Sequence, residues 1–247
     1  MMPTSGATEF SGKAMIPSLS AGSGCFQCAQ ERSAGRNYCG ACGSLLRPRR
    51  ERKHVTVLFA DVSGFTALSE RLDPEQVSEI MEQTFDVVLQ VVHEHGGTVN
   101  QFLGDGVMAL FGDGSPEQHA RRALGAAQAI QERLETVRDE VRCSYGLEFR
   151  VRIGVNTGPV VIGTIGAALR TDYTATGNTA SMASGLLHIA EPGQIVLTDE
   201  TRALAAGYYD FAEVGAMPLT ESRETVIVYE LRCETTDYVE SEDLIAV

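Results

Sequence analysis

Residues 55–66 read VTVLFADVSGFT, and this segment carries the plainest structural signal in the chain. Val55 to Ala60 form a continuous run of apolar, β-branched and aromatic residues, which predicts a buried central strand. Asp61 ends the predicted strand. Gly64, in the turn that follows, lets backbone N–H groups approach an anion closely. A strand-end carboxylate beside amide donors outlines a site for a divalent cation and a phosphate.

Around this strand the hydrophobic period alternates between strand and helix. Asp73 and Pro74 begin a predicted helix that ends at Gly96-Gly97, and residues 115–118 begin a second one with a capping-box signature. Apolar runs on both sides of Asp105-Gly106 predict a tight hairpin. The other predicted elements are strands at 149–156, 160–165, 194–198, near Phe211 and at 226–231, a helix at 178–189 and a short helix between 198 and Phe211. This order predicts one domain with a mixed sheet flanked by helices.

Composition sets the class of protein. The chain has 247 residues, of which 43% are hydrophobic and 21% charged, and it can therefore bury one core. The 20 Lys and Arg against 33 Asp and Glu give a net charge of −13, which excludes nucleic-acid binding through the overall field. No stretch approaches the roughly 18 apolar residues of a membrane span, and no signal peptide is evident. We therefore expect a cytoplasmic protein without a membrane span.

The sequence divides into five parts. We expect a disordered N-terminus at residues 1–24, a cysteine-rich unit at 25–46, a basic linker at 47–54, the large domain at 55–233 and an acidic flexible tail at 234–247. The basic linker and the cysteine unit together could also bind nucleic acid. A short charge run is more often a solvated connector, so this reading is the weaker one.

The cysteine-rich unit contains two Cys-x-x-Cys pairs, formed by Cys25 with Cys28 and by Cys39 with Cys42. This spacing places four thiolates within reach of one tetrahedral cation and predicts a zinc ribbon. Zn²⁺ would be structural, because four protein ligands leave no open position for chemistry. Unrelated buried cysteines or two disulfides are the alternative.

A second carboxylate strengthens the cation site. Asp105 lies at the predicted hairpin tip, which can lie beside the end of the first strand. Either aspartate alone could be an ordinary turn or cap residue. Together, a strand-end and a turn carboxylate could hold two hard cations over a triphosphate.

At this point the sequence resembles the class III adenylate and guanylate cyclases. The motifs that carry the resemblance are Phe59 to Thr66, Gly104 to Gly112, Arg152 to Gly158, and Asp172-Tyr173, in the family's order. The resemblance covers about residues 54–233. It implies an α+β, ferredoxin-like cyclase fold that dimerises head to tail, with the nucleotide between the subunits.

The resemblance also assigns residues to roles. It implies that Asp61, Asp105 and the carbonyl of Val62 hold two Mg²⁺ or Mn²⁺ ions, and that the turn contacts the triphosphate. The base-reading positions become Gln101 and Thr174, and the position that orients the ribose becomes Ser181. The full expected nucleotide-binding set is Val62, Ser63, Gly64, Phe65, Thr66, Gln101, Thr174 and Ser181.

This chain departs from the family at several of these positions. Gln101 stands where a base-reading Lys is usual, Ser181 where an Asn is usual, and Gly185 where an Arg neutralises the transition state. A further cationic position falls on Thr220, with Arg223 close by. A glycine cannot stabilise developing phosphoryl charge, and losing such a cation costs roughly 10³–10⁵ in rate in other phosphoryl-transfer enzymes.

Two functions therefore remain open. The first is a cyclase that converts a nucleoside triphosphate, most simply ATP, to a 3′,5′-cyclic nucleotide and pyrophosphate. It would be weak as a homodimer or dependent on a heterodimer partner that supplies the missing groups. The second is a catalytically inactive cyclase-like module that binds nucleotide or protein and acts in regulation. The accepted base, adenine, guanine or a pyrimidine, is also open.

Overall fold

The computed structural model describes residues 51–165, 172–219 and 225–234, together with residues 28, 30 and 39–42 near the N-terminus. The N-terminal cysteines up to Cys42 and the large domain belong to two separate compact units. Cys25, the predicted disordered segment 1–24 and most of the predicted tail lie outside the described residues. No helix in these ranges is both long and apolar enough to cross a membrane.

The large domain is built on a sheet with β1 (Glu51–Ser63) in its interior. β1 pairs antiparallel with β3 (Gly106–Phe111) on one side and with β4 (Arg150–Ile165) on the other. The described strands run in the order β2-β3-β1-β4-β6-β8-β7, and β5 pairs with β4. The remaining strands are β2 (Thr98–Leu103), β5 (Asp172–Thr176), β6 (Ile195–Thr198), β7 (Tyr209–Pro218) and β8 (Thr225–Glu234).

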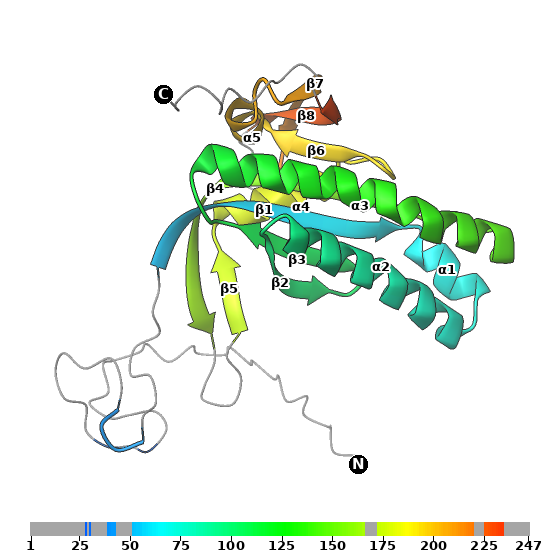
Figure 1. The fold of residues 1–247 in the computed structure, drawn as a ribbon, viewed down its shortest axis with the longest axis horizontal. Coiled ribbons are helices and arrows are strands. Elements are labelled where there is room, and N and C mark those ends of the chain that lie inside the picture. The colour runs from blue at the N-terminus through cyan, green and yellow to red at the C-terminus, as the bar shows by residue number, and fades with distance from the viewer. Residues whose placement is uncertain are drawn as a thin grey trace, which may run out of the picture. The chain divides into compact units, whose positions relative to one another are not determined.

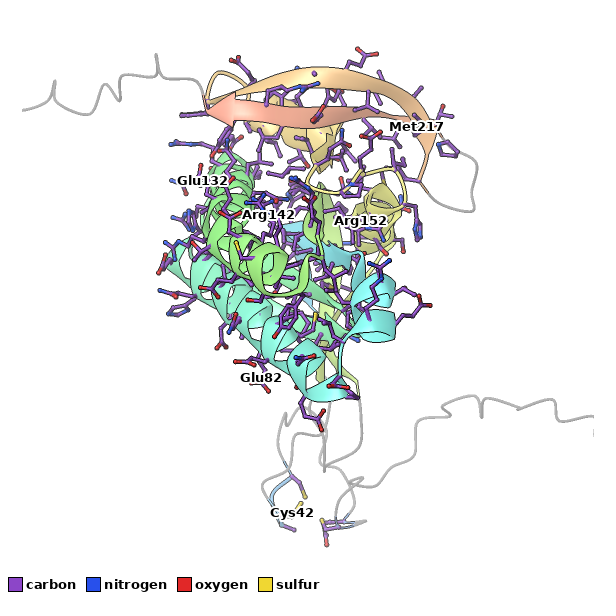
Figure 2. The ribbon with its side chains drawn as sticks, turned by 90° about the vertical axis from the view of Figure 1, so that its right-hand side faces the viewer. Cys42, Glu82, Glu132, Arg142, Arg152 and Met217 are labelled. Carbon is purple, nitrogen blue, oxygen red and sulfur yellow. The ribbon has the colours of Figure 1, made fainter. Side chains whose placement is uncertain are left out.

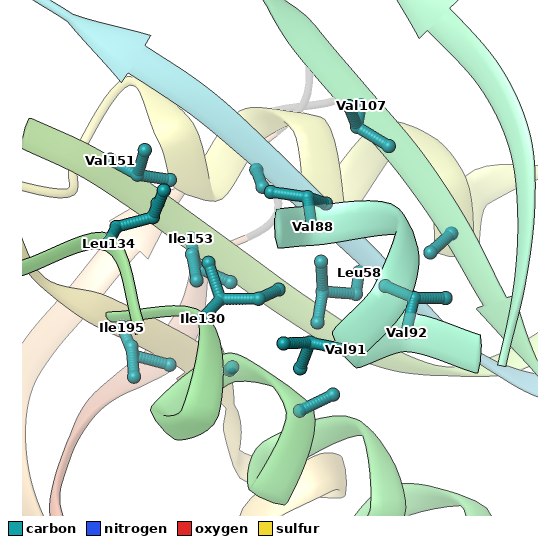
Figure 3. Close-up of a cluster of buried hydrophobic side chains, with 14 of the residues drawn as sticks. Leu58, Val88, Val91, Val92, Val107, Ile130, Leu134, Val151, Ile153 and Ile195 are labelled. Atoms are coloured by element: carbon teal, nitrogen blue, oxygen red, sulfur yellow. The ribbon is translucent and has the colours of Figure 1, made fainter. Parts of the chain in front are cut away.

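Helices cover both faces of the sheet (Figure 1). α2 (Pro74–Glu94) and α3 (Pro116–Tyr145) lie along one face, and α4 (Asn178–Leu187) packs against the other. Two short helices, α1 (Phe65–Arg71) and α5 (Asp199–Leu204), follow β1 and β6. The larger core lies between α2, α3 and the sheet, where Val88, Ile130 and Ile153 meet (Figure 3). The mixed sheet with flanking helices confirms the predicted architecture.

The period of two along β1 sorts its side chains between these faces. Leu58 and Ala60 belong to the core under α2 and α3, whereas Val57 and Phe59 pack with α4 residues. Asp61 follows the odd-numbered set. Its carboxylate therefore lies on the α4 face of the sheet, at the end where β1 leaves it.

Several predicted boundaries differ from the structure. Residues 51–54, assigned to a basic linker, form the start of β1. The two strands predicted at 149–156 and 160–165 are one continuous strand, β4, despite Pro159. The carbonyl of Pro159 points to Thr179 of α4, away from β1, so the N–H that proline lacks would also point away from that ladder. β5 and α1 had no counterpart among the predicted elements.

A chain of buried polar side chains crosses the domain. Thr56 of β1 contacts Nδ1 of His119 on α3 at 2.8 Å and the hydroxyl of Thr157 on β4 at 2.8 Å. Thr201 of α5 donates to Thr157 at 3.1 Å. Since each hydroxyl has one hydrogen, one direction satisfies all four groups: Thr157 donates to Thr56, and Thr56 donates to His119. Nδ1 of His119 is then an acceptor.

A second set of buried polar groups, next to the first, leads to α4 on the other face of the sheet. Thr198, which lies 3.3 Å from Thr201, donates to Oδ1 of Asn156 at 2.7 Å, and Nδ2 of Asn156 donates to the carbonyl of Thr179 at 3.0 Å. All of these side chains are buried. Because a buried polar group without a partner is costly, the bonds through Thr198 and Asn156 fasten the first turn of α4 to the sheet.

We expect the stability of the domain to fall in mild acid because of His119. Burial lowers the pKa of His119, and His54 and Arg122 lower it further, against a smaller opposing effect of Glu117. The unfolded chain therefore binds this proton more readily, so stability is fully present above about pH 6.5 and declines as the pH falls below that value. His119→Gln should reduce the loss in the free energy of unfolding between about pH 7 and 5.5, measured by urea titration.

The matched control is His93→Gln, which changes an exposed histidine in the last turn of α2. It should keep the wild-type pH dependence over the same interval. Equal pH dependence in wild type and His119→Gln would contradict the role given to His119.

Candidate functional site

Asp61, at the end of β1, lies between β3 and β4. The sequence predicted only the first of these neighbours, the hairpin strand. On β3 its register partner is Gly106, and on β4 it is Arg152. A side chain at position 106 would begin 3.1 Å from the carbonyl oxygen of Ala60 and 3.3 Å from Oδ1 of Asp61, so the glycine leaves room beside the carboxylate. The Asp61 side chain is only 16% exposed.

Arg152 pairs with this carboxylate. Its Nε and Nη2 donate to Oδ2 of Asp61 at 2.8 and 2.6 Å. Arg152 stands in one of the family motifs, yet the sequence reasoning assigned it no role. Only the register of β1 against β4 places the two side chains together, and local sequence gives no signal for that register (Figure 2 marks Arg152).

Asp105 is brought to the same edge by a backbone hydrogen bond. The N–H of Val62, the residue after Asp61, donates to the carbonyl of Asp105 at 3.2 Å. This bond holds the tip of the β2–β3 hairpin against the end of β1, and the Asp105 side chain is half-buried there. The structure therefore places the backbone of Asp105 beside Asp61 and Val62 at the end of β1.

The turn after β1 is compact. Gly64 adopts a left-handed conformation with φ of 94°, which favours glycine, and a side chain there would meet the carbonyl of Glu148 at 3.3 Å. Phe65 packs partly against the core, whereas Thr66 is exposed. The hydroxyl of Ser63 is buried and, among the described residues, has no hydrogen-bond partner.

The residues at this edge suit a hard cation. Two carboxylates and a backbone carbonyl are oxygen donors of the kind that Mg²⁺ and Mn²⁺ prefer. Oδ2 of Asp61 accepts from Arg152, whereas Oδ1 lies on the side that Gly106 leaves open, and the buried Ser63 hydroxyl has no partner among the described residues. The donor set therefore fits a divalent cation.

A β-bulge at Asn100 determines where Gln101 points. Val99 pairs with Ala109 and packs toward α2, and regular alternation would place Gln101 on that same side. The register shift instead sets Gln101 opposite Met108, which belongs to the cluster under α4. Gln101 is exposed and shares the face of Asp61. The sequence contains no evident signal for this bulge.

The remaining nucleotide positions lie on β5 and α4. Thr174 pairs with Gly163 of β4, although its side chain is outside the described set. Ser181 is exposed on α4, and its hydroxyl contacts the carbonyl of Gly177 at 3.4 Å. α4 is fastened at Asn156, four residues along β4 from Arg152, which corresponds to roughly 13 Å along the strand.

Gly185 is more constrained than its position in a helix suggests. A side chain there would begin 2.1 Å from the carbonyl oxygen of Leu219, the buried residue that follows β7. The obstacle is backbone, which cannot rotate away as a flexible side chain can. The backbone of Leu219 therefore occupies the space that a longer residue at 185 would need. Thr220 and Arg223 lie outside the described residues.

The described cysteines form a separate cluster. The sulfur atoms of Cys28, Cys39 and Cys42 lie within 4.8 Å of one another, and those of Cys28 and Cys39 are 3.6 Å apart. Hydrogen bonds from the backbone at Cys42 and Ala41 lower the pKa of the Cys39 thiol, which favours the thiolate that binds metal. None of these three cysteines is in a disulfide.

Comparison with known proteins now identifies the large domain. Residues 48–233 match the family described as the adenylate and guanylate cyclase catalytic domain. The chain belongs to this family. The resemblance drawn from the motifs is thus confirmed at the level of the family and its fold.

Individual relatives cover the cyclase domain. The chain is 41% identical over 136 residues to adenylate cyclase 1 of Rhizobium meliloti, a match that covers 55% of this chain and 20% of that protein. It therefore spans only a fraction of the relative's length. The crystal structure of the adenylyl cyclase CyaB from P. aeruginosa superposes with a TM-score of 0.73 at 29% identity, over 77% of this chain and 100% of that one.

A guanylyl cyclase structure matches nearly as well. The crystal structure of the guanylyl cyclase Cya2 superposes with a TM-score of 0.69 at 30% identity, over 76% of this chain and 96% of that one. Because the domain is similar to both an adenylyl and a guanylyl cyclase, similarity alone does not identify the nucleotide base of its substrate.

The packing at Gly185 predicts that alanine at this position destabilises the domain, which is the opposite of the usual effect of this substitution in a helix. Replacing a helical glycine by alanine normally stabilises a helix by up to about 1 kcal/mol. Gly185→Ala should instead lower the free energy of unfolding by about 1–3 kcal/mol, because its methyl group would overlap the Leu219 carbonyl. Urea or thermal unfolding measures the difference.

Gly125→Ala in α3 is the matched control. Its methyl group would meet only side-chain atoms, of His95 at 3.3 Å and Tyr209 at 3.4 Å, so we expect a change within about 1 kcal/mol. A stabilised Gly185→Ala would show that the Leu219 segment moves aside without cost.

Proposed function

We propose that this cyclase domain contributes the metal-binding half of a nucleotidyl cyclase site. The substrate would be a nucleoside triphosphate, most simply ATP, and the products a 3′,5′-cyclic nucleotide and pyrophosphate. The observation that carries this proposal is the backbone hydrogen bond from Val62 to Asp105, which holds the tip of the hairpin against the end of β1, where Asp61 lies.

The residues at this edge have distinct parts in the proposal. Asp61, Asp105 and the Val62 carbonyl would hold two Mg²⁺ or Mn²⁺ ions and thereby orient the triphosphate. When bound, the ions would supply Lewis acidity for attack of the ribose 3′-oxygen and for departure of pyrophosphate. The reaction forms one bond from the 3′-oxygen to the α-phosphorus, breaks the bond from that phosphorus to pyrophosphate and releases the hydroxyl proton.

The residues on α4, which would form the other half of a cyclase site, support dependence on a partner chain. Ser181 brings only a short hydroxyl to α4, and the Leu219 backbone leaves no room for a cation at Gly185. In a head-to-tail dimer the two halves of each site belong to different subunits. A homodimer would then be weak, whereas a heterodimer with a chain that carries the missing groups could build one complete site.

A purely regulatory module is the second candidate, and the packing at Gly185 favours it. An arginine at this position would require the Leu219 backbone to move. The packing of the domain therefore favours the glycine that leaves α4 without a cation. Such a module would bind nucleotide or a partner chain without turnover.

The deciding measurement is a product assay by mass spectrometry with Mn²⁺ and each of ATP, GTP, CTP and UTP. We expect slow formation of a cyclic product that Asp61→Ala and Asp105→Ala abolish. Asp113→Ala, which alters an exposed aspartate in the loop after β3, is the matched control and should retain the wild-type rate.

The possible results separate the two candidates. Cyclic product in wild type and Asp113→Ala alone would establish the cyclase and name its base. Binding of nucleotide with no product, both alone and on mixing with a second cyclase chain, would establish the regulatory module. Gain of product on mixing with a second cyclase chain, lost again in Asp61→Ala, would establish complementation by a partner.

We also propose that Cys25, Cys28, Cys39 and Cys42 bind one structural Zn²⁺. The clustering of three of these thiols supports this role, and Cys25 would complete the tetrahedral set. Metal analysis should find about one Zn²⁺ per chain, and Cys39→Ser should lose most of it.

Cys143→Ser is the matched control, because Cys143 is an exposed free thiol on α3 apart from the cluster. It should keep the full zinc content. Zinc that is retained in Cys39→Ser, or absent from the wild-type protein, would contradict the proposal.

A further inference from the structure

A groove of about 500 Å³ lies between the end of α2, the first half of α3 and the start of β7. His95, which follows α2, and Tyr209 of β7 line it. Gly125 of α3 lies beside both, since a side chain there would begin 3.3 Å from the His95 ring and 3.4 Å from the Tyr209 hydroxyl. The glycine therefore keeps the groove open. A volume of this order is sufficient for a ligand or a short peptide segment.

The groove carries local positive charge on a protein whose net charge is −13. Arg121 and Arg122 line one end of it, and Glu132 lies further along the same helix, roughly 15 Å from Arg122 by helical rise (Figure 2 labels Glu132). Arg122 is exposed, and its Nη1 donates to the carbonyl of Asp113 at 3.2 Å. Within the described residues this neutral acceptor is the recorded partner of Arg122, so its charge is available to an anion.

The segment that follows β8 begins beside this groove. Glu234, the last residue of β8, pairs in register with Tyr209, and the Tyr209 hydroxyl donates to the carbonyl of Arg121 at 3.1 Å. Residues 235–247, the acidic segment, contain no basic residue, and their carboxylates belong to Asp237, Glu240, Glu242 and Asp243. A chain extends by at most roughly 3.5 Å per residue, so these carboxylates can reach between roughly 10 and 30 Å from Glu234. The acidic segment is therefore long enough to lie along the groove from Tyr209 to Arg122.

We propose that the acidic segment docks in this groove of its own chain, with its carboxylates against Arg122. Attachment at Glu234 favours this occupant, because a short tether holds the segment at an effective concentration in the millimolar range. A weak attraction is then enough for the groove to be occupied. The docked segment joins β8 to α2 and α3, on the face of the sheet opposite to Asp61. The groove and the candidate cyclase site can therefore be occupied together.

The test uses a carbodiimide, which forms an amide bond between a carboxylate and an amine that are in contact. The lysines of the chain are Lys13 and Lys53, so α3 has no side-chain amine of its own. Arg122→Lys keeps the positive charge and adds one amine to the groove. In the full chain at low salt, peptide mass spectrometry should find bonds between position 122 and carboxylates of the acidic segment. Their yield should fall about tenfold at about 1 M salt, where the Debye length is ~3 Å.

Arg142→Lys is the matched control. Arg142 is exposed on the same helix, roughly 30 Å beyond Arg122, and donates to Asp139 at 2.7 Å. Its substitution should give a bond to Asp139 and less than about a tenth of the acidic-segment bonds formed at position 122, because a tether of this length barely spans the distance. A segment that only swept over the surface would react at both positions.

Mixing chains labelled with ¹⁴N and ¹⁵N before the reaction identifies the occupant of the groove. Bonds confined to peptides of one label would place the acidic segment in the groove of its own chain, as proposed. Bonds that join the two labels at their statistical share would show that a second copy supplies the segment. Equal yields at positions 122 and 142, or none at 122, would show that the groove does not select it. Either of the last two results overturns the inference and leaves the cyclase proposal, which rests on Asp61 and Asp105, untouched.

Discussion

The pairing of β1 on both of its edges is the constraint from which the candidate site follows. Antiparallel ladders to β3 and β4 set Asp61 opposite Gly106 on one side and Arg152 on the other. A slip of one residue would turn Asp61 toward the apolar core under α2 and α3, where a charge is costly. The packing of that core against Leu58 and its neighbours therefore also fixes the position of the carboxylate.

Much of the fold could be predicted because its signals are local. Pro74 at the start of α2, the capping box before α3 and the Asp105-Gly106 turn each bias the backbone within a few residues. The continuity of β4 through Pro159 could not be predicted in this way. It depends on which of the two strand edges the missing N–H faces, and that is a property of the assembled sheet.

The candidate site shows the same division. Asp61 and Asp105 stand in short motifs, and a backbone hydrogen bond from Val62 to Asp105 joins these two motifs. The orientation of Gln101, by contrast, depends on the Asn100 bulge, and the pairing of Arg152 depends on strand register. The tight contact of Gly185 with Leu219 joins a helix to a distant loop. These features arise from contacts between residues that are remote in sequence, so no local sequence pattern predicts them.

The helix α4, which carries Ser181 and Gly185 where the family usually has an Asn and an Arg, is held by specific packing contacts at both ends. Asn156 and Thr179 fasten the first turn of α4, and the buried series of hydrogen bonds behind them leaves each of its members paired. At the other end of the helix, the Leu219 backbone closes against Gly185. The two ends of the helix are thus held by specific contacts. The groups that α4 presents are therefore set by the packing of the whole domain, and not by the sequence of the helix alone.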